Sequence, residues 1–399
     1  MSGASVKLLN HSYINTKYAP YQITMDIDKN SFLPVALYGI DVSIANAIRR
    51  VIMSEVRNLA FSPIDIKLLL NKSQYHNEVL IKRFGYIIIN MDYVNDNQIK
   101  PSEIRLVLSS NDNIDVPLKN DTQSIIKVYL HQHMSLLING KKLDIKQLCP
   151  YNSLLLTLRP NEEIHAEMIP SYGIGLQNAI WHSGICAYKF ATITDEKTDE
   201  EGYVPQIETN EELLKYIGYD RRKPVSIILT IESIGKFTSI DLLKKSVEVI
   251  SEKVEQIEKM ILLSKLDIDV DQNTPYLVKY RIKNEDHTIG NVLEYYTLMR
   301  LIYYIKKTVE NLIQSETIEE SSKDDEVMQL ITQCVCGYRK VHPDDQFIEL
   351  CLQIPHTHPL FFAKDQYVDQ TPSNRIVLSA ISDIKEILDK IRGNLGRGT

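Results

Sequence analysis

A heptad pattern of apolar residues in the middle of the chain constrains the fold more than any other sequence feature. Between residues 240 and 261 apolar side chains recur at alternating steps of three and four: Ile240, Leu243, Val247, Ile250, Val254, Ile257 and Ile261. This spacing places them on one stripe of an α-helix, and the stripe needs a long partner surface to be buried. Ser239, directly before the stripe, is a candidate N-cap. We therefore expect a long amphipathic helix that packs lengthwise on another element.

A second stripe of the same period lies near the C-terminus. Its members are Val377, Ile381, Ile384, Leu388 and Ile391. Two stripes of matching period favour a pair of helices packed together within the chain. The alternative is that each helix packs on a sheet of its own, as most amphipathic helices do. A shorter helix is expected over Ile44–Val56, behind the candidate N-cap Ser43.

The segments around these helices predict a mixed α+β chain. A length of 399 residues is enough for two or three domains. From about residue 61 to 220, short apolar runs alternate with turn-forming clusters, which is typical of a mainly β domain. Residues 266–275 have the composition of a linker, and the acidic stretches 194–212 and 315–326 indicate solvated loops. The second half should contain a strand at Leu277–Ile282 and a helix from about Thr288. A further strand is expected where every second residue is apolar: Ile348, Leu350, Leu352 and Ile354.

Composition argues against several classes of protein. The formal net charge of −7 argues against a broad nucleic-acid-binding surface, which needs clustered lysine and arginine. No apolar run approaches the roughly 18 residues of a membrane span, and the first residues do not have the pattern of a secretory signal. Five scattered cysteines then favour reduced thiols. We expect a soluble intracellular protein with no membrane contact.

Two short motifs contain pairs of residues that can bind metals. Cys334 and Cys336 are separated by one residue, as are His356 and His358, and each pair could chelate from one face of a strand. Zinc sites more often use a two-residue spacing, so we interpret these residues as packed thiols and surface histidines. The sequence predicts no metal and no cofactor.

Two carboxylates precede a histidine at Glu285, Asp286 and His287, a combination that can serve catalysis. A catalytic interpretation would use His287 as a general acid and base. The structural interpretation is that Asp286 or Thr288 caps the following helix and that Gly290 allows another element to approach closely. No phosphate-binding loop, nucleophile elbow or cluster of metal-binding carboxylates is recognisable. We therefore expect no catalytic centre in this chain.

The same segment carries a family resemblance. Residues 284–293, NEDHTIGNVL, closely resemble the EDHT-x-GN signature of the small alpha-like RNA polymerase subunit, which is the eleventh subunit of eukaryotic polymerase II and has an L-type counterpart in archaea. Residues 336–343, CGYRKVHP, are similar to the AGY-x-x-PHP segment of that small protein, although Asp344 follows where an apolar residue is usual. The second heptad stripe falls where the small protein has its C-terminal dimerisation helix.

The first half resembles the larger partner of that small protein. This partner is the third subunit of polymerase II, with a D-type counterpart in archaea and the alpha N-terminal domain in bacteria. Residues 45–56, ANAIRRVIMSEV, are similar to ANALRR…SEVP, although Arg57 replaces the proline. Residues 77–89, NEVLIKRFGYIII, are similar to NEVLAHRLGLIPI. Residues 173–181 resemble the GIG-x-x-HAKW run, with Gln177 and Asn178 as departures, and residues 230–235 resemble T-V-E-S-x-G.

The resemblance implies two alpha-type dimerisation modules in one polypeptide, packed through long helices, with a mainly β insert in the first half. Residues 1–60 and 221–265 would form the D-like module, 61–220 the insert, 266–275 the linker and 276–399 the L-like module. Such fusions resemble those of large nucleocytoplasmic DNA viruses. The location would then be the virion and host cytoplasm, or the nucleus if the protein is cellular.

The resemblance implies a non-catalytic assembly subunit of a DNA-directed RNA polymerase, acting in transcription. Its partners would be the large catalytic subunits and other small subunits, without direct sequence-specific contact to nucleic acid. The alternative is a free-standing scaffold that uses alpha-like modules outside a polymerase.

The resemblance also assigns roles to residues. Docking of a large subunit would use Asn46, Arg49 and Arg50, since adjacent guanidinium groups suit carboxylate and carbonyl acceptors; the alternative is a merely solvated face. The dimerisation interface would consist of Ile44, Ile48, Ile240, Leu243, Val247, Ile250, Val254, Ile257, Ile289, Leu293, Val377, Ile381, Ile384 and Leu388. Structural motif positions would be Glu285, Asp286, His287, Thr288, Gly290, Asn291, Gly337, Tyr338, His342, Pro343, Gly173, Gly175 and Trp181.

Overall fold

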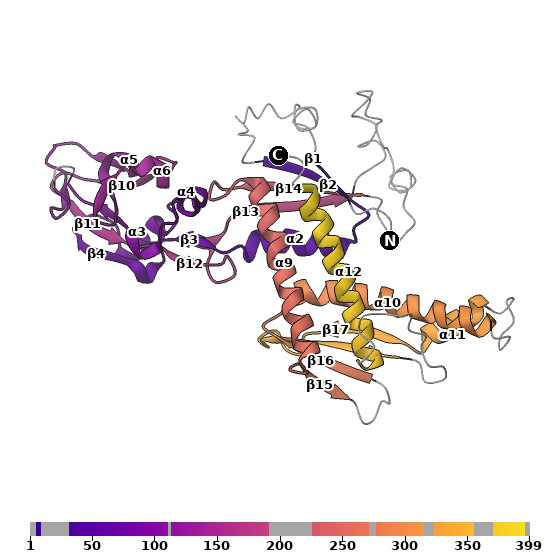
Figure 1. Ribbon diagram of the computed structural model, residues 1–399. Helices are drawn as coiled ribbons and strands as arrows, with labels where there is room; N and C mark the ends of the chain where they lie inside the picture. The colour runs from indigo at the N-terminus through magenta and orange to yellow at the C-terminus, as the bar shows by residue number, and fades with distance from the viewer. Residues whose placement is uncertain are drawn as a thin grey trace, which may run out of the picture.

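The structure is a computed structural model that describes residues 5–8, 32–110, 113–190, 226–270, 277–314, 323–354 and 370–395. Two antiparallel sheets lie at opposite ends of a group of four helices, and a third body of short strands and helices projects to one side (Figure 1). The mixture of helices and sheets agrees with the expected α+β class. In the described residues no helix is both long enough and apolar enough to cross a membrane.

The first sheet has four strands in the order β1 (Ser5–Leu8), β2 (Phe32–Tyr38), β14 (Ser226–Ser233) and β13 (Gly184–Phe190). Strand β2 lies in a stretch whose proline suggests a turn. Pro34 pairs with Thr230 of β14 but lies beyond Val35, the last residue of β2 that pairs with β1. A strand tolerates proline at such a position because no ladder bond on the open side is lost.

The second sheet is built entirely from the second half, in the order β15 (Asp267–Val270), β16 (Leu277–Lys283), β18 (Phe347–Gln353) and β17 (Val335–Arg339). The expected linker 266–275 is therefore wrong in its first part, because residues 267–270 pair with β16. Asp267 and Asp269 alternate with Ile268 and Val270, and this alternation is typical of a strand. The acidic composition of the segment had instead suggested a linker.

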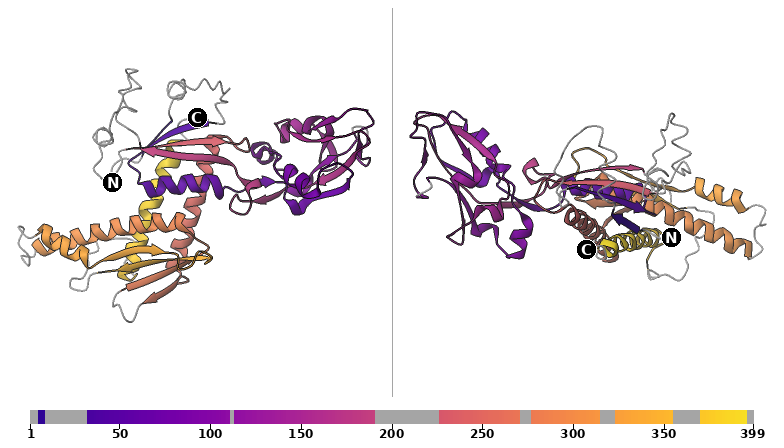
Figure 2. Two further views of the ribbon diagram at one scale, coloured as in Figure 1. Left: turned by 180° about the vertical axis from the view of Figure 1, so that it is seen from behind. Right: turned by 90° about the horizontal axis from the view of Figure 1, so that it is seen from above.

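Four helices connect the sheets: α2 (Val42–Ser54), α9 (Ser239–Leu262), α10 (His287–Gln314) and α12 (Pro372–Leu395). Helices α9 and α12 run side by side between the two sheets, and α2 and α10 lie against each other behind them (Figures 1 and 2). Both long helices with heptad stripes therefore contact each other, and α9 also contacts β14 while α12 contacts β1. A short helix, α11 (Lys323–Thr332), packs on α10 and contains the end of the acidic stretch 315–326.

The helix starts differ slightly from expectation. The N-cap of α2 is Asp41 rather than Ser43, and its carboxylate accepts a hydrogen bond from the Ser43 amide at 2.7 Å. The N-cap of α9 is Thr238 rather than Ser239. In both cases the capping oxygen must precede the amides of the first turn, and the earlier residue satisfies this geometry.

The projecting body contains most of the expected insert 61–220, but β13 near the end of that range belongs to the first sheet, because it pairs with β14. Its largest sheet has the order β4-β11-β5-β8-β9, with β6 paired to β11, and two further strand pairs are β10-β7 and β12-β3. Its elements are β3 (Asn58–Ala60), η2 (Pro63–Asp65), β4 (Ile66–Asn71), α3 (Asn77–Gly85), α4 (Met91–Asp96), η3 (Pro101–Glu103), β5 (Ile104–Leu108), β6 (Leu118–Lys119), β7 (Ile126–Tyr129), α5 (Leu130–His133), β8 (Met134–Ile138), β9 (Lys141–Leu143), α6 (Ile145–Leu148), β10 (Leu154–Leu158), β11 (Glu163–Met168), β12 (Ser171–Gly173) and η4 (Ala179–Trp181). The acidic stretch 194–212 lies outside the described residues.

Candidate functional site

The helices of the two halves meet at a lysine between two carboxylates. Lys253 of α9 places its Nζ 2.7 Å from Glu55 at the end of α2 and 2.9 Å from Glu285 at the start of α10. The two glutamate side chains are only 12% and 10% exposed, so little water screens this contact. We call these three residues the Lys253 joint, since they tie both halves of the chain together.

Burial and charge act in opposite directions at this joint. Burial alone would lower the pKa of Lys253, but the Glu285 and Glu55 carboxylates outweigh it, so that its pKa is raised. Burial raises the pKa of Glu285 to about 7, although the Lys253 charge opposes that shift. Lys253 therefore stays charged at neutral pH, while Glu285 lies near the middle of its titration.

A pH dependence follows for the variant Glu285→Gln. The pKa of Glu285 is raised in the folded protein from 4.5 to about 7, so the folded state binds this proton more tightly than the unfolded state. The stabilisation is complete below about pH 4.5 and is lost as the pH rises to 7 and above. The neutral glutamine avoids the loss, which is at most about 3 kcal/mol. The melting temperature of Glu285→Gln relative to the unmodified protein should increase by a few degrees between pH 5 and pH 8.

The control for this measurement is Glu252→Gln, which removes an exposed carboxylate from α9. Its melting curve should follow that of the unmodified protein at every pH. If the difference in melting temperature between Glu285→Gln and the unmodified protein stays constant from pH 5 to pH 8, burial does not raise the pKa of Glu285 into this range.

A second contact between the halves involves Arg50 of α2. Its Nη2 lies 2.9 Å from Asp286, and its Nε donates to the Thr288 hydroxyl at 2.8 Å. Asp286 also accepts from the Thr288 amide at 2.8 Å, so Asp286 rather than Thr288 caps α10. Burial alone would raise the pKa of Asp286, but the bonds from Thr288 and the charge of Arg50 hold it below its usual value. The guanidinium that was expected to face a large subunit thus contacts the same chain.

Asn46 and Arg49 form a separate cluster on α2. The Nε and Nη2 atoms of Arg49 donate to the side-chain oxygen of Asn46 at 3.1 and 3.0 Å, and Nη1 reaches the sulfur of Met53 at 3.6 Å. Both residues remain partly exposed. The structure therefore brings together two of the three expected docking residues and turns the third, Arg50, toward α10.

Helix α12 is held by further polar contacts. The Arg300 guanidinium of α10 makes two hydrogen bonds to the buried carboxylate of Asp383. Lys385 of α12 lies 2.9 Å from Glu258 of α9. Each ion pair joins two different helices, so the polar contacts reinforce the same arrangement as the apolar stripes.

Thirteen of the fourteen residues expected at the dimerisation interface are buried; Ile240 is only half-buried. Ile240 belongs to the first turn of α9, and the neighbouring Leu242 is buried in its place. The stripe therefore begins at Leu243 and runs to Ile261.

Two of the motif glycines lie against aromatic rings. A Cβ on Gly290 would lie 2.4 Å from the ring of Tyr338, and a Cβ on Gly173 would lie 2.3 Å from the ring of Trp181. The Trp181 indole also donates to the Ser171 carbonyl at 3.1 Å. Glycine is needed at both positions because any side chain would separate the packed elements.

The remaining motif residues have local contacts. His287 lies edge-on to Tyr338, with its Nδ1 3.1 Å from the tyrosine hydroxyl. The side-chain amide of Asn291 donates to the His287 backbone carbonyl at 3.0 Å. Gly175 packs on the Met53 carbonyl at the end of α2. Gly337 belongs to β17, and His342 and Pro343 lie in the connection to β18.

The cysteine motif is a packing feature in this structure. Cys336 donates to the Glu294 carbonyl of α10, and Cys334 donates to the Leu330 carbonyl of α11. Burial raises the pKa of Cys336 to about 12 and that of Cys334 to about 11. In the part of the chain that the structure describes, no three metal-binding side chains gather; His356 and His358 lie outside that part.

The sequence did not indicate a buried lysine where the projecting body joins the first sheet. Lys236 is 2% exposed, and its Nζ donates to the Asn58 side-chain oxygen at 2.7 Å and to the Ile180 carbonyl at 2.5 Å. Burial lowers its pKa to about 7. Asn58 in turn donates to Ser183 at 2.9 Å, so one polar network fixes this junction.

Comparison with known proteins places this arrangement in a family. Residues 35–254, more than half of the chain, match the RNA polymerase Rpb3/Rpb11 dimerisation domain. The chain belongs to this family. The matched region begins within β2 and ends within α9, so it includes α2, the projecting body and Lys253.

One relative among curated proteins is the DNA-directed RNA polymerase subunit Rpo3 of Methanosphaera stadtmanae. The identity is 28% over 194 residues, which cover 43% of this chain and 63% of the relative. The chain thus spans less than two thirds of the length of the relative it matches.

Proposed function

We propose that this chain is a non-catalytic assembly subunit of a multisubunit DNA-directed RNA polymerase and acts in transcription. The first-half module, whose sheet also contains β13, and the second-half module form an internal dimer, from which the body between β3 and η4 projects. The large catalytic subunits and other small subunits dock on this dimer inside the cell. Two such modules in one chain resemble the fusions of large nucleocytoplasmic DNA viruses, and we propose a viral source on that resemblance.

The observation that supports the proposal is the common core of α2, α9, α10 and α12. Apolar stripes from both halves are buried together, and each buried Ile or Leu contributes roughly 1.5–3 kcal/mol. The Lys253 joint and the Arg50–Asp286 pair connect the helices of the family domain to the start of α10. Because both modules belong to one chain, their pairing is intramolecular, with an effective concentration in roughly the millimolar range.

Affinity purification of the tagged full chain from the cells that produce it tests the proposal. Stoichiometric recovery of the two large polymerase subunits is the expected result. Recovery of the chain alone, or with unrelated proteins, would favour the alternative of a free-standing scaffold.

The docking role is tested by replacing Arg49 and Arg50 one at a time. Arg49→Ala removes a partly exposed guanidinium whose hydrogen bonds lie within α2, so the melting temperature should stay within about one degree. Capture of the large subunits should weaken about tenfold. Arg50→Ala instead leaves Asp286 without its partner, and we expect it to cost about 1 kcal/mol of stability because the pair is partly exposed.

Thermal melting and quantitative pull-down of both variants measure these effects. Equal pull-down by Arg49→Ala and the unmodified chain would remove Arg49 from the docking surface. A full loss of folding in Arg49→Ala would show that its role is structural.

A further inference from the structure

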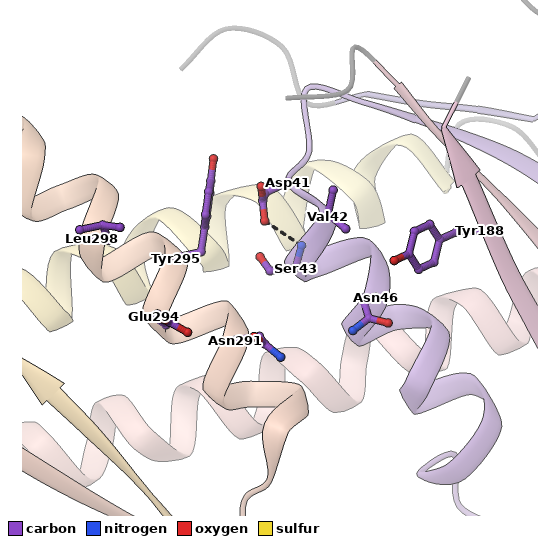
Figure 3. A pocket seen from close by; sticks show the side chains of 9 residues that line it. All are labelled: Asp41, Val42, Ser43, Asn46, Tyr188, Asn291, Glu294, Tyr295 and Leu298. Carbon is purple, nitrogen blue, oxygen red and sulfur yellow. Dashed lines mark hydrogen bonds between the residues drawn. The ribbon is translucent and has the colours of Figure 1, made fainter. Parts of the chain in front are cut away.

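A pocket of about 370 Å³ lies between the two halves, at the start of α2 (Figure 3). Its walls come from α2, α10 and β13, and its lining is Asp41, Val42, Ser43, Asn46, Tyr188, Asn291, Glu294, Tyr295 and Leu298. Two carboxylates and two phenols face a hollow whose lining includes no lysine or arginine. The pocket therefore combines negative charge with aromatic surface.

The carboxylate of Glu294 is not compensated within the described structure. No ion pair joins it to a described cation, and burial raises its pKa above the usual value. On α2, Arg49 directs its guanidinium to Asn46 and Met53, and Arg50 directs its guanidinium to Asp286 and Thr288. A half-buried carboxylate without a cation is costly, and a positively charged group would remove that cost.

Other groups in the pocket can also accept hydrogen bonds. The Ser43 hydroxyl is buried and has no partner among the described residues. The pKa of Tyr295 is raised to about 12 by burial and by the Asp41 carboxylate, so this phenol stays neutral. Neutral phenol rings attract cations through their faces.

The N-terminus of α2 opposes a cation, because a helix carries about half a positive charge there. Two carboxylates outweigh that half charge, and Asp41 already caps the helix end. The balance of charge therefore favours a positively charged occupant over an anion.

The surroundings of the pocket favour a protein as the source of this cation. Tyr188 belongs to β13, which among the described strands pairs on one side only, with β14. A strand edge without a described partner, beside a polar pocket, suits an extended polypeptide better than a free ion. We propose that the pocket receives an arginine or lysine side chain from another protein subunit. The inference rests on the proposed function, since a polymerase subunit would supply that side chain.

The test uses two substitutions that remove charge and keep shape. Asp41→Asn retains a good helix cap, and Glu294→Gln retains the size of the side chain. The control is the double variant Glu252→Gln with Asp389→Asn, which removes two exposed carboxylates elsewhere. Both double variants change the net charge equally, so any difference between them belongs to the pocket.

Two measurements are made on each full-length protein. In the first, the other polymerase subunits are co-expressed and their retention on the tagged chain is followed as salt increases. Asp41→Asn with Glu294→Gln should weaken retention about tenfold, while the control matches the unmodified chain. Retention that is equal in all three proteins overturns the pocket proposal and leaves the proposed function intact.

In the second measurement, binding of an arginine tripeptide amide is compared with that of its neutral citrulline counterpart by saturation-transfer NMR. The unmodified chain and the control should prefer arginine, and the pocket variant should lose this preference. If the unmodified chain retains no polymerase subunits, the proposed function fails, and an arginine preference that depends on the pocket still supports the cation site. Equal signals from the two peptides with the unmodified chain overturn the cation-site proposal. The proposal is also overturned if the pocket variant differs from the unmodified chain only in self-association, measured by light scattering.

Discussion

Replacing Ile250 by aspartate is expected to prevent folding of the helical core. Ile250 lies in the middle of α9, is 0% exposed, and belongs to the stripe that faces the other helices. The change loses about 1.5–3 kcal/mol of apolar burial and in addition removes a carboxylate from water into the apolar stripe. The combined cost approaches the 5–15 kcal/mol that stabilises a typical domain. Circular dichroism melting and size-exclusion chromatography should show an unfolded or aggregated protein.

The matched control is Gln256→Asp, which introduces the same side chain at an exposed position of the same helix. Its effect should stay within about 0.5 kcal/mol. Cooperative melting of Ile250→Asp at the temperature of the unmodified protein would show that the α9 stripe does not form a core.

The apolar periodicity predicted the helices because burial has a direct sequence signal. A residue that recurs every three or four positions marks one face, and both stripes are buried in the structure. The same periodicity could not identify the partner of each face. The packing of α9 on α12 depends on residues more than a hundred positions apart, and the alternative of separate sheets was consistent with the same pattern.

Charged residues inside apolar faces were the signal that the sequence interpretation passed over. Lys253 stands between Ile250 and Val254 of the first stripe, and Asp383 stands between Ile381 and Ile384 of the second. A charge at such a position must find a partner when the helix packs. Its presence predicts an ion pair, but the identity of the partner requires the fold.

The docking prediction shows a related limit. A motif places Asn46, Arg49 and Arg50 on one helix, yet neighbouring residues on a helix point about 100° apart. Arg49 therefore turns toward Asn46, while Arg50 reaches Asp286. Sequence alone gave both arginines one role, and only the position of α10 separates them. The pocket beside Asn46 was likewise beyond prediction, because its walls come from three distant segments.

Charge reversal at Lys253 should strongly destabilise the contact between the two halves. Lys253→Glu would place three carboxylates together, with Glu55 and Glu285 each about nine-tenths buried. Removing one partner of a buried pair costs about 3–5 kcal/mol, and repulsion adds to this cost. The unfolding midpoint in urea should fall sharply, and the first and second halves should lose their fixed contact.

The reciprocal variant distinguishes loss of this contact from a general effect of charge. Glu55 ends α2, where a lysine is favourable, so Glu55→Lys combined with Lys253→Glu restores one ion pair without harm to the helix end. The double variant should therefore recover a large part of the stability that Lys253→Glu loses. The control Lys259→Glu reverses a charge that is 69% exposed in the last turn of the same helix, and it should cost no more than about 1 kcal/mol. If the double variant is as unstable as the sum of its single changes, the three residues act independently, and the Lys253 joint does not hold the halves together as a unit.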